Sequence, residues 1–171
     1  MTKSPVQKIV PHLWYAKDAE EAAGFYASIF PDSRVERVWT LPTESPSGPS
    51  GSVKIVDFVL FGQRFQAMTA GPHHDFNDAV SLMVECEDQA ELDRYWKAIE
   101  DNGGKPQACG WITDRWGLRW QIVPRKLEEM MADEDKVRAK RVAEAMLKMV
   151  KLDLAALERA YQGTGTQSAA Q

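Results

Sequence analysis

The chain has 171 residues, of which 44% are hydrophobic and 27% charged, which is an ordinary globular composition with enough apolar residues to bury a core. Its formal net charge of −4 argues against nucleic acid or an anionic membrane as a partner, because both require a basic surface. The sequence predicts a cytoplasmic protein. It has only two cysteines and no signal-peptide pattern, and no apolar run approaches the roughly 20 residues of a membrane span.

The first part of the chain predicts one strand, one helix and three further strands. Residues 6–16 have β character. Asp18 and Glu21 form a capping-box pattern at the start of a helix that Pro31 ends. The later strands are expected over residues 34–41, 53–61 and 64–69.

A segment rich in Pro, Gly and Ser separates the second strand from the third. Residues 41–52 cannot hold a regular element, and they fit either a hairpin excursion or a lid over a site.

The second part repeats this order. A strand is expected at 80–86, a helix capped by Asp88 at 89–101, and later strands at 107–112 and 118–123.

Helices are expected to follow the second set of strands. The pattern predicts an amphipathic helix over 134–150 and a short helix from Asp153 to about Tyr161, and then a disordered tail over 163–171.

The repetition is visible in the residues themselves. Gly62–Met68 resembles Gly117–Val123 at an offset of 55, and Val10–Asp18 resembles Val80–Asp88 at an offset of 70. In this alignment Pro11 matches Ser81, and Gln66 matches Gln121. An internal duplication therefore divides the chain. The expected parts are a first module at 1–70, a second at 71–124, C-terminal helices at 125–162 and the tail at 163–171.

Several motifs resemble those of the glyoxalase/bleomycin-resistance/dioxygenase (vicinal oxygen chelate) superfamily. They are Phe25–Pro31, Gly71–Asn77, Cys109–Pro124 and Met146–Glu158, and they are similar to the PhnB-like branch, whose members are often called 3-demethylubiquinone-9 3-methyltransferase-like. The resemblance implies an α+β fold of two tandem βαβββ modules forming curled sheets around a cavity, with a helical C-terminal extension. It also implies a homodimer.

Metal binding is not expected from this resemblance. The superfamily positions that hold a divalent metal correspond here to Pro11, Gln66, Ser81 and Gln121, which offer poor ligand atoms. His12 is expected to face the helix side together with Trp14. The sequence also lacks a Gly-rich strand-to-helix loop for S-adenosylmethionine, so no cofactor is expected.

A pocket for a small-molecule ligand is expected instead. Its proposed lining is Leu13, Tyr15, Gln66, Met68, His73, Ser81, Met83, Cys109, Trp111 and Gln121. A buried amide needs partners, so the two glutamines bind each other, water or the ligand.

Two of these residues have plainer alternatives. His73 is either at the pocket rim or in a solvated loop, and Cys109 is either a small buried thiol or a nucleophile.

The function expected from these features is that of a metal-free small-molecule binding protein or an enzyme of the superfamily. The alternatives are a metal-dependent lyase or dioxygenase, and a PhnB-like protein whose methyltransferase name has chemical meaning. A metal-free acid–base or thiol enzyme is a further option.

Overall fold

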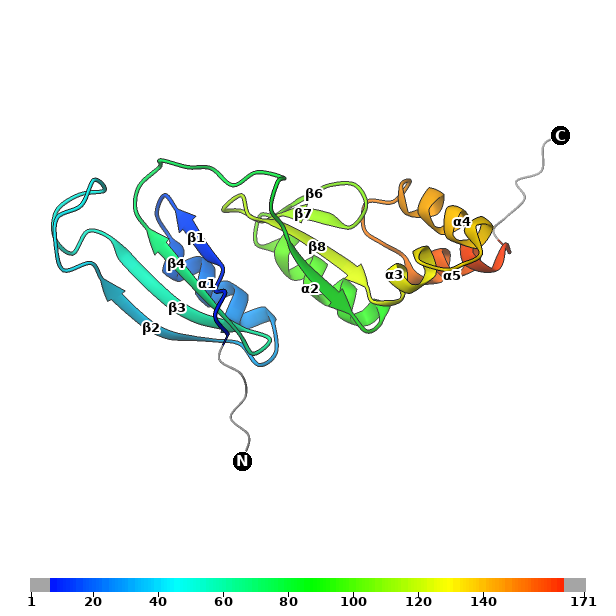
Figure 1. Ribbon diagram of the computed structural model, residues 1–171, viewed down its shortest axis with the longest axis horizontal. Coiled ribbons are helices and arrows are strands. Elements are labelled where there is room, and N and C mark those ends of the chain that lie inside the picture. The colour runs from blue at the N-terminus through cyan, green and yellow to red at the C-terminus, as the bar shows by residue number, and fades with distance from the viewer. Residues whose placement is uncertain (1–6, 165–171) are drawn as a thin grey trace, which may run out of the picture. The chain divides into compact units, whose positions relative to one another are not determined.

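The computed structural model describes residues 7–164, which divide into two compact units, the first ending at Asp75 and the second beginning at Phe76. Each unit repeats the order strand, helix and three strands, and the second also carries the C-terminal helices (Figure 1). The α+β fold of two tandem βαβββ modules is therefore confirmed. Within residues 7–164 no helix combines the length and the apolar character that crossing a membrane requires.

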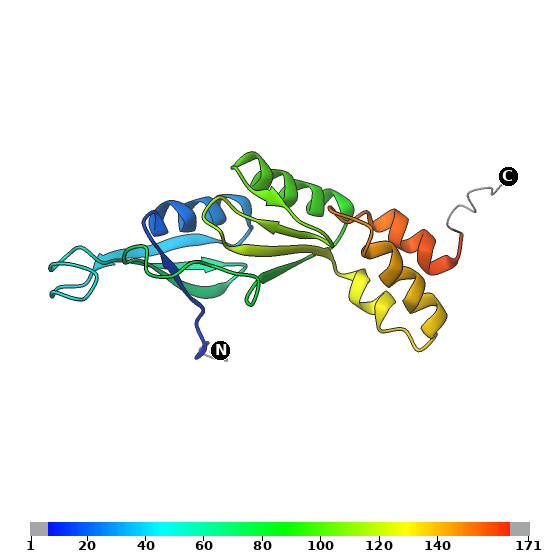
Figure 2. The same ribbon diagram turned by 90° about the horizontal axis from the view of Figure 1, so that it is seen from above.

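The first unit consists of one mixed sheet with one helix. Its elements are β1 (His12–Tyr15), α1 (Ala19–Ile29), β2 (Arg34–Thr40), β3 (Lys54–Leu60) and β4 (Gln63–Thr69). The strand order is β1-β4-β3-β2, with β1 parallel to β4 and the other pairs antiparallel. Helix α1 runs along one face of this sheet (Figure 2).

The two faces of strand β1 carry the opposite residues from those expected. The hydroxyls of Tyr15 and Tyr26 are 3.1 Å apart and buried, so Tyr15 points toward α1. Because side chains alternate along a strand, Leu13 also faces α1, while His12 and Trp14 lie on the open face. The prediction that His12 and Trp14 face the helix is wrong.

The cause lies in the turn between strand and helix. β1 ends three residues before Asp18, whereas the matching strand of the second unit ends two residues before Asp88. Asp18 absorbs the extra residue in a left-handed conformation, at φ 74°, and its side chain caps no N–H of the described helix. The predicted capping box is therefore absent at Asp18. It forms at Asp88, whose Oδ1 accepts a hydrogen bond from the backbone N of Glu91.

The turn between β3 and β4 falls one residue earlier than expected. Phe61 and Gly62 have φ values of 48° and 76°, and two positive φ angles in succession are typical of the turn that matches the twist of a hairpin. The long segment before β3 forms turns and one isolated bridge between Ser45 and Gly48.

The second unit has the same sheet order, β5-β8-β7-β6. Its elements are β5 (Leu82–Cys86), α2 (Gln89–Asp101), β6 (Lys105–Pro106), β7 (Trp111–Thr113), β8 (Arg119–Pro124), α3 (Lys126–Met131), α4 (Lys136–Met146) and α5 (Leu154–Gln162). Helix α2 has the bounds that the sequence predicts. Figure 2 shows it along one face of this sheet.

The C-terminal helices differ from the prediction. Helix α3 was not expected, because it starts immediately after the last strand without a cap pattern. The helix predicted over 134–150 ends at Met146, since the following carbonyls bond elsewhere. Gly163 closes α5 in a left-handed conformation. Most of the predicted tail lies outside the described residues.

A buried carboxylate fixes the turn between β7 and β8. Asp114 is 4% exposed. Its Oδ1 accepts hydrogen bonds from the backbone N–H groups of Trp116 and Leu118, and its Oδ2 accepts one from the indole Nε1 of Trp120 at 2.9 Å. These three donors satisfy a charge that would otherwise be costly to bury. They also set the register in which Trp111 lies opposite Gln121.

We predict that Asp114→Ala lowers the free energy of unfolding by about 2–4 kcal/mol, because three buried donors lose their acceptor. Urea denaturation would measure the change. Asp101→Ala is the matched control. Its carboxylate forms an exposed ion pair with Lys97 on the surface of α2, so the loss there should stay below about 0.5 kcal/mol. Equal effects of the two substitutions would contradict the role of Asp114.

Candidate functional site

A pocket of about 390 Å³ lies in the second unit, on the sheet face opposite α2. The sheet contributes Met83, Glu85, Trp111, Gln121 and Val123 to its lining. The other walls are Cys109, Pro124 and Arg125 together with the helical residues Leu127, Glu128, Met131 and Met146.

The register of three strands sets the floor of the pocket. Met83 pairs with Gln121, and Gln121 pairs with Trp111, so the three side chains form one row across the sheet. Glu85 and Val123 pair in the next row. Met83 is 55% exposed, which is unusual for a large apolar side chain and leaves its thioether open to a ligand.

Backbone hydrogen bonds hold the segment that follows α4 against the second sheet, beside the pocket. The N–H groups of Cys109 and Gly110 donate to the carbonyls of Met149 and Val150, both at 2.8 Å. Both donors have positive φ values, 60° and 81°. A Cβ on Gly110 would lie 2.9 Å from Cδ1 of Leu152, so only glycine fits this close approach. The segment that follows α4 is thereby bound to the sheet.

A second contact holds the same segment from α2. The side chain of Gln89 donates to the carbonyl of Leu152 and accepts from the backbone N of Leu154. Lys151 forms an ion pair with Asp93 at 2.7 Å. These contacts keep the C-terminal helices beside the pocket.

The two repeated glutamines find different partners. Gln121 Nε2 donates to Ser81 Oγ at 2.8 Å within the second unit. In the first unit Gln66 Nε2 donates to Asp57 Oδ1 at 2.7 Å. Each amide therefore donates to a neighbouring side chain of its own unit. The expected partners were the other glutamine, water or the ligand, so neither Asp57 nor Ser81 was foreseen.

Asp57 is the centre of a polar cluster on the open face of the first sheet. Its Oδ2 accepts hydrogen bonds from Arg37 at 2.7 and 2.9 Å and from the indole of Trp39 at 3.2 Å. Burial raises the pKa of Asp57, but the hydrogen bonds from Gln66, Arg37 and Trp39 outweigh burial and lower the pKa below its ordinary value. Asp57 is therefore held as the carboxylate.

The residues predicted to bind a ligand separate into three groups. Met83, Cys109, Trp111 and Gln121 line the pocket, and Ser81 binds Gln121. On the open face of the first sheet, Gln66 binds Asp57, Met68 packs beside Trp14, and the His73 ring lies edge-on to Trp14 with the ring centroids 5.9 Å apart. Leu13 and Tyr15 face α1 instead, so we remove them from the site.

Sequence reasoning missed the helical side of the pocket. Leu127, Met131 and Met146 contribute apolar surface, and Glu85 and Glu128 contribute carboxylates. The apolar residues of helices α3 and α4 had no pattern that points to a ligand rather than to a core.

The side chains at the superfamily metal positions fit a resident metal poorly. The β1 residue paired with Gln66 is His12 rather than Pro11, so the first unit offers one imidazole and one neutral amide. Ser81 and Gln121 in the second unit offer a hydroxyl and another neutral amide. Such a set contains a single imidazole and no carboxylate or thiolate, whereas zinc and related ions are usually held by at least three such ligands. Among residues 7–164, no three His, Cys, Asp or Glu side chains gather as a metal site.

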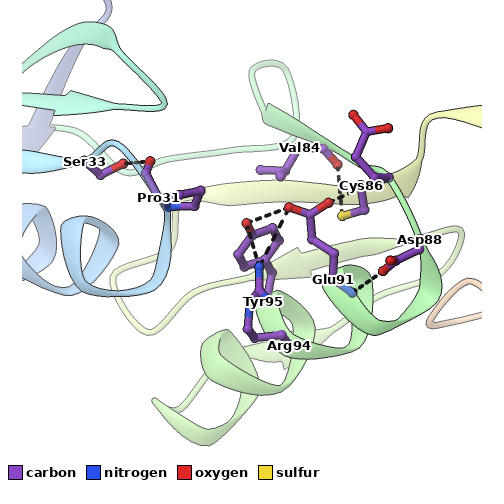
Figure 3. A network of polar contacts seen from close by, with 9 residues as sticks. Pro31, Ser33, Val84, Cys86, Asp88, Glu91, Arg94 and Tyr95 are labelled. Atoms are coloured by element: carbon purple, nitrogen blue, oxygen red, sulfur yellow. Dashed lines mark hydrogen bonds and ion pairs between the residues drawn. The ribbon is translucent and has the colours of Figure 1, made fainter.

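The other cysteine lies on the α2 side of the second sheet. Cys86 is fully buried, and burial together with nearby carboxylates such as Glu91 raises the pKa of its thiol to about 12. Figure 3 shows Glu91 beside it, where the carboxylate accepts hydrogen bonds from the Tyr95 hydroxyl and the backbone N of Glu87. Cys86 is therefore an unreactive core thiol.

Comparison with known proteins places this architecture among the tandem βαβββ proteins. FosX from Mesorhizobium loti shares the fold at a TM-score of 0.54, with 14% identity over 78% of this chain and 100% of its own. Glyoxalase I from Leishmania major shares it at a TM-score of 0.52, with 11% identity over 77% of this chain and 95% of its own.

A sequence profile described as 3-demethylubiquinone-9 3-methyltransferase matches residues 7–123, and the chain belongs to that family. A PhnB protein from Bacillus cereus with the same methyltransferase description is 30% identical, at a TM-score of 0.60 over 69% of this chain and 99% of its own. No curated protein sequence matches the chain. The PhnB-like branch of the vicinal oxygen chelate superfamily is thus confirmed.

We predict that one thiol per chain reacts quickly with a disulfide reagent at pH 8. Cys109 lines the pocket and is only partly buried, whereas Cys86 is inaccessible and protonated. Cys109→Ser should abolish the fast phase, and Cys86→Ser should leave it unchanged. Two fast thiols in the native protein would contradict this assignment.

We predict that the polar cluster contributes to stability mainly above the acid range. A carboxyl with a lowered pKa stabilises the fold above its unfolded value near 3.8, and this contribution is lost as the pH falls through the lower folded value. Asp57→Asn should therefore reduce the free energy of unfolding at pH 7 by about 1–2 kcal/mol. The difference from the native chain should shrink toward pH 3, as denaturation at each pH would measure. A difference in the free energy of unfolding that stays the same from pH 7 to pH 3 would contradict this role of Asp57.

Proposed function

We propose that the protein binds a small, largely apolar molecule in the pocket on the open face of the second sheet. The observation that carries the proposal is the accessible apolar floor formed by Met83 and Trp111, with Met131 and Met146 on the helical side. An apolar cavity with few polar groups is the usual form of a small-molecule site, and its volume lies within the range of roughly 300–1,000 Å³ seen for such sites.

Gln121 supplies the directional contact in this proposal. Its Nε2 donates one of its two N–H groups to Ser81, which holds the amide in place, and we assign the hydrogen bond with the ligand to its acceptor Oε1. The thiol of Cys109 also borders the cavity.

A methyltransferase reaction has little support in the residues. The segments between β1 and α1 and between β5 and α2 contain no glycine, and the carboxylate of Asp88 occupies the start of α2. A nucleotide-bearing cofactor is usually held at such a junction by a Gly-rich loop. The side chains at the superfamily metal positions, which are one imidazole, two neutral amides and one hydroxyl, likewise give little support to a metal-dependent lyase or dioxygenase.

Assembly and location stay predictions. Unpaired edge strands such as β2 and β5 favour a homodimer, because an exposed sheet edge can pair with another chain. A cytoplasmic location is the expectation drawn from the sequence.

We predict that Met83→Gln weakens binding of the neutral fluorescent probe N-phenyl-1-naphthylamine about fivefold to tenfold. The reason is the loss of apolar contact on the pocket floor, which corresponds to roughly 1–1.4 kcal/mol. Fluorescence titration would measure it. Val80→Gln is the matched control, because Val80 is 68% exposed and lies outside the pocket. Equal affinities for both variants and the native chain would reject the pocket.

A further inference from the structure

We propose that the occupant of this pocket is an amphiphilic cation, with an apolar body and one ammonium-like group. This inference rests on the function proposed above, because it specifies the chemistry of the molecule that the same pocket binds. Charge, aromatic character and the order of residues along the strands each contribute to it.

The charges that line the pocket are unbalanced. Two carboxylates, Glu85 and Glu128, face one guanidinium, that of Arg125. The short ion pair of Arg125, at 2.5 Å, is made with Glu87, which does not line the pocket. Arg125 also forms a longer ion pair with Glu85 at 3.7 Å, so its single positive charge is shared between two carboxylates. The lining therefore carries a net negative charge that attracts a cation.

The apolar lining also suits a cation that carries hydrocarbon. Trp111 is half-buried in the floor, and its indole face offers a flat aromatic surface against which the apolar body of such a cation can pack. Met83, Met131 and Met146 supply flexible, polarizable thioethers that adapt to an alkyl or aromatic body. A hydrated inorganic cation would gain nothing from these side chains.

The order along the strands orients the ligand. Glu85 lies one row beyond Met83, toward the end where β8 leads into α3 and Glu128. Two residues along a strand span about 7 Å. The ammonium group should thus lie near Glu85 and Glu128, with the body over Met83 and Trp111. A spacer of about four bonds between the two parts fits this separation.

The helical extension supplies much of this selectivity. The family profile ends at residue 123, whereas Glu128, Met131 and Met146 lie beyond it. Part of the acidic and apolar lining of the pocket therefore comes from the helices that follow the duplicated module.

Three probes that share a phenylbutyl body test the inference. They are 4-phenylbutylammonium, the neutral 4-phenylbutan-1-ol and the anionic 5-phenylpentanoate. They would be titrated into protein carrying ¹³C-methyl methionine, so that the resonances of Met83, Met131 and Met146 report occupancy of this pocket. We expect the ammonium to bind at least tenfold more tightly than the alcohol at 50 mM salt. This advantage should shrink at 300 mM salt, and the carboxylate should bind most weakly.

Charge-neutralising variants locate the preference. Glu85→Gln and Glu128→Gln should each reduce the advantage of the ammonium over the alcohol about threefold while leaving the affinity for the alcohol unchanged. Glu100→Gln is the matched control. Glu100 is exposed on α2, and its substitution removes the same charge outside the pocket. All three positions are exposed, so the fold tolerates the substitutions.

The outcomes separate the two proposals. Equal binding of ammonium and alcohol, or tightest binding of the carboxylate, would overturn the preference for a cation and leave the pocket in place. A preference that Glu100→Gln reduces as much as Glu85→Gln would overturn the assignment to this pocket. Failure of every probe to shift the three methionine resonances would overturn the proposed binding function as well.

Discussion

Two backbone hydrogen bonds, from Cys109 and Gly110 to the carbonyls of Met149 and Val150, join the C-terminal helices to the second sheet. They require a chain that turns through two successive left-handed residues, and Gly110 leaves just enough room for Leu152. Because Met146 lies three residues before the first acceptor, the same contact places α4 beside the pocket. Without it the face that carries Met83 and Trp111 would be an open sheet surface.

The duplicated glutamines show how the two modules diverged while keeping one framework. Gln66 binds a carboxylate whose other donors are Arg37 and Trp39, so the open face of the first sheet holds a saturated charged cluster. Gln121 donates a hydrogen bond to the hydroxyl of Ser81 and lies among apolar neighbours. A saturated cluster contributes to stability, whereas an amide with a remaining acceptor in an apolar cavity favours recognition.

Membership in the PhnB-like branch identifies the framework without identifying the chemistry. Proteins that share the fold are named for fosfomycin resistance and glyoxalase activity, and a more similar one is named for methyl transfer, so the fold supports several functions. This chain combines side chains that bind metal poorly at the superfamily metal positions with a pocket bordered by its C-terminal helices. Both features favour the binding of an apolar molecule over metal chemistry.

The sequence by itself determined the duplication, the strand and helix order and the family. The repeated Gly-x-x-x-Gln stretches and the capped helix at Gln89–Asp101 are local patterns, and local patterns survive in any arrangement of the modules. Sequence reasoning also selected Met83, Cys109, Trp111 and Gln121, which the structure brings to one pocket.

Only the tertiary structure decided which face each residue occupies and what covers it. One extra residue before Asp18 reverses β1, because a strand alternates its side chains, and this moved Leu13 and Tyr15 under α1 and His12 into the open. The acceptors for the Cys109 and Gly110 N–H groups lie 40 residues further along the chain, and helix α3 packs against α4 and α5. Such contacts leave no periodic signal in the chain, so the helical side of the pocket appeared only with the folded structure.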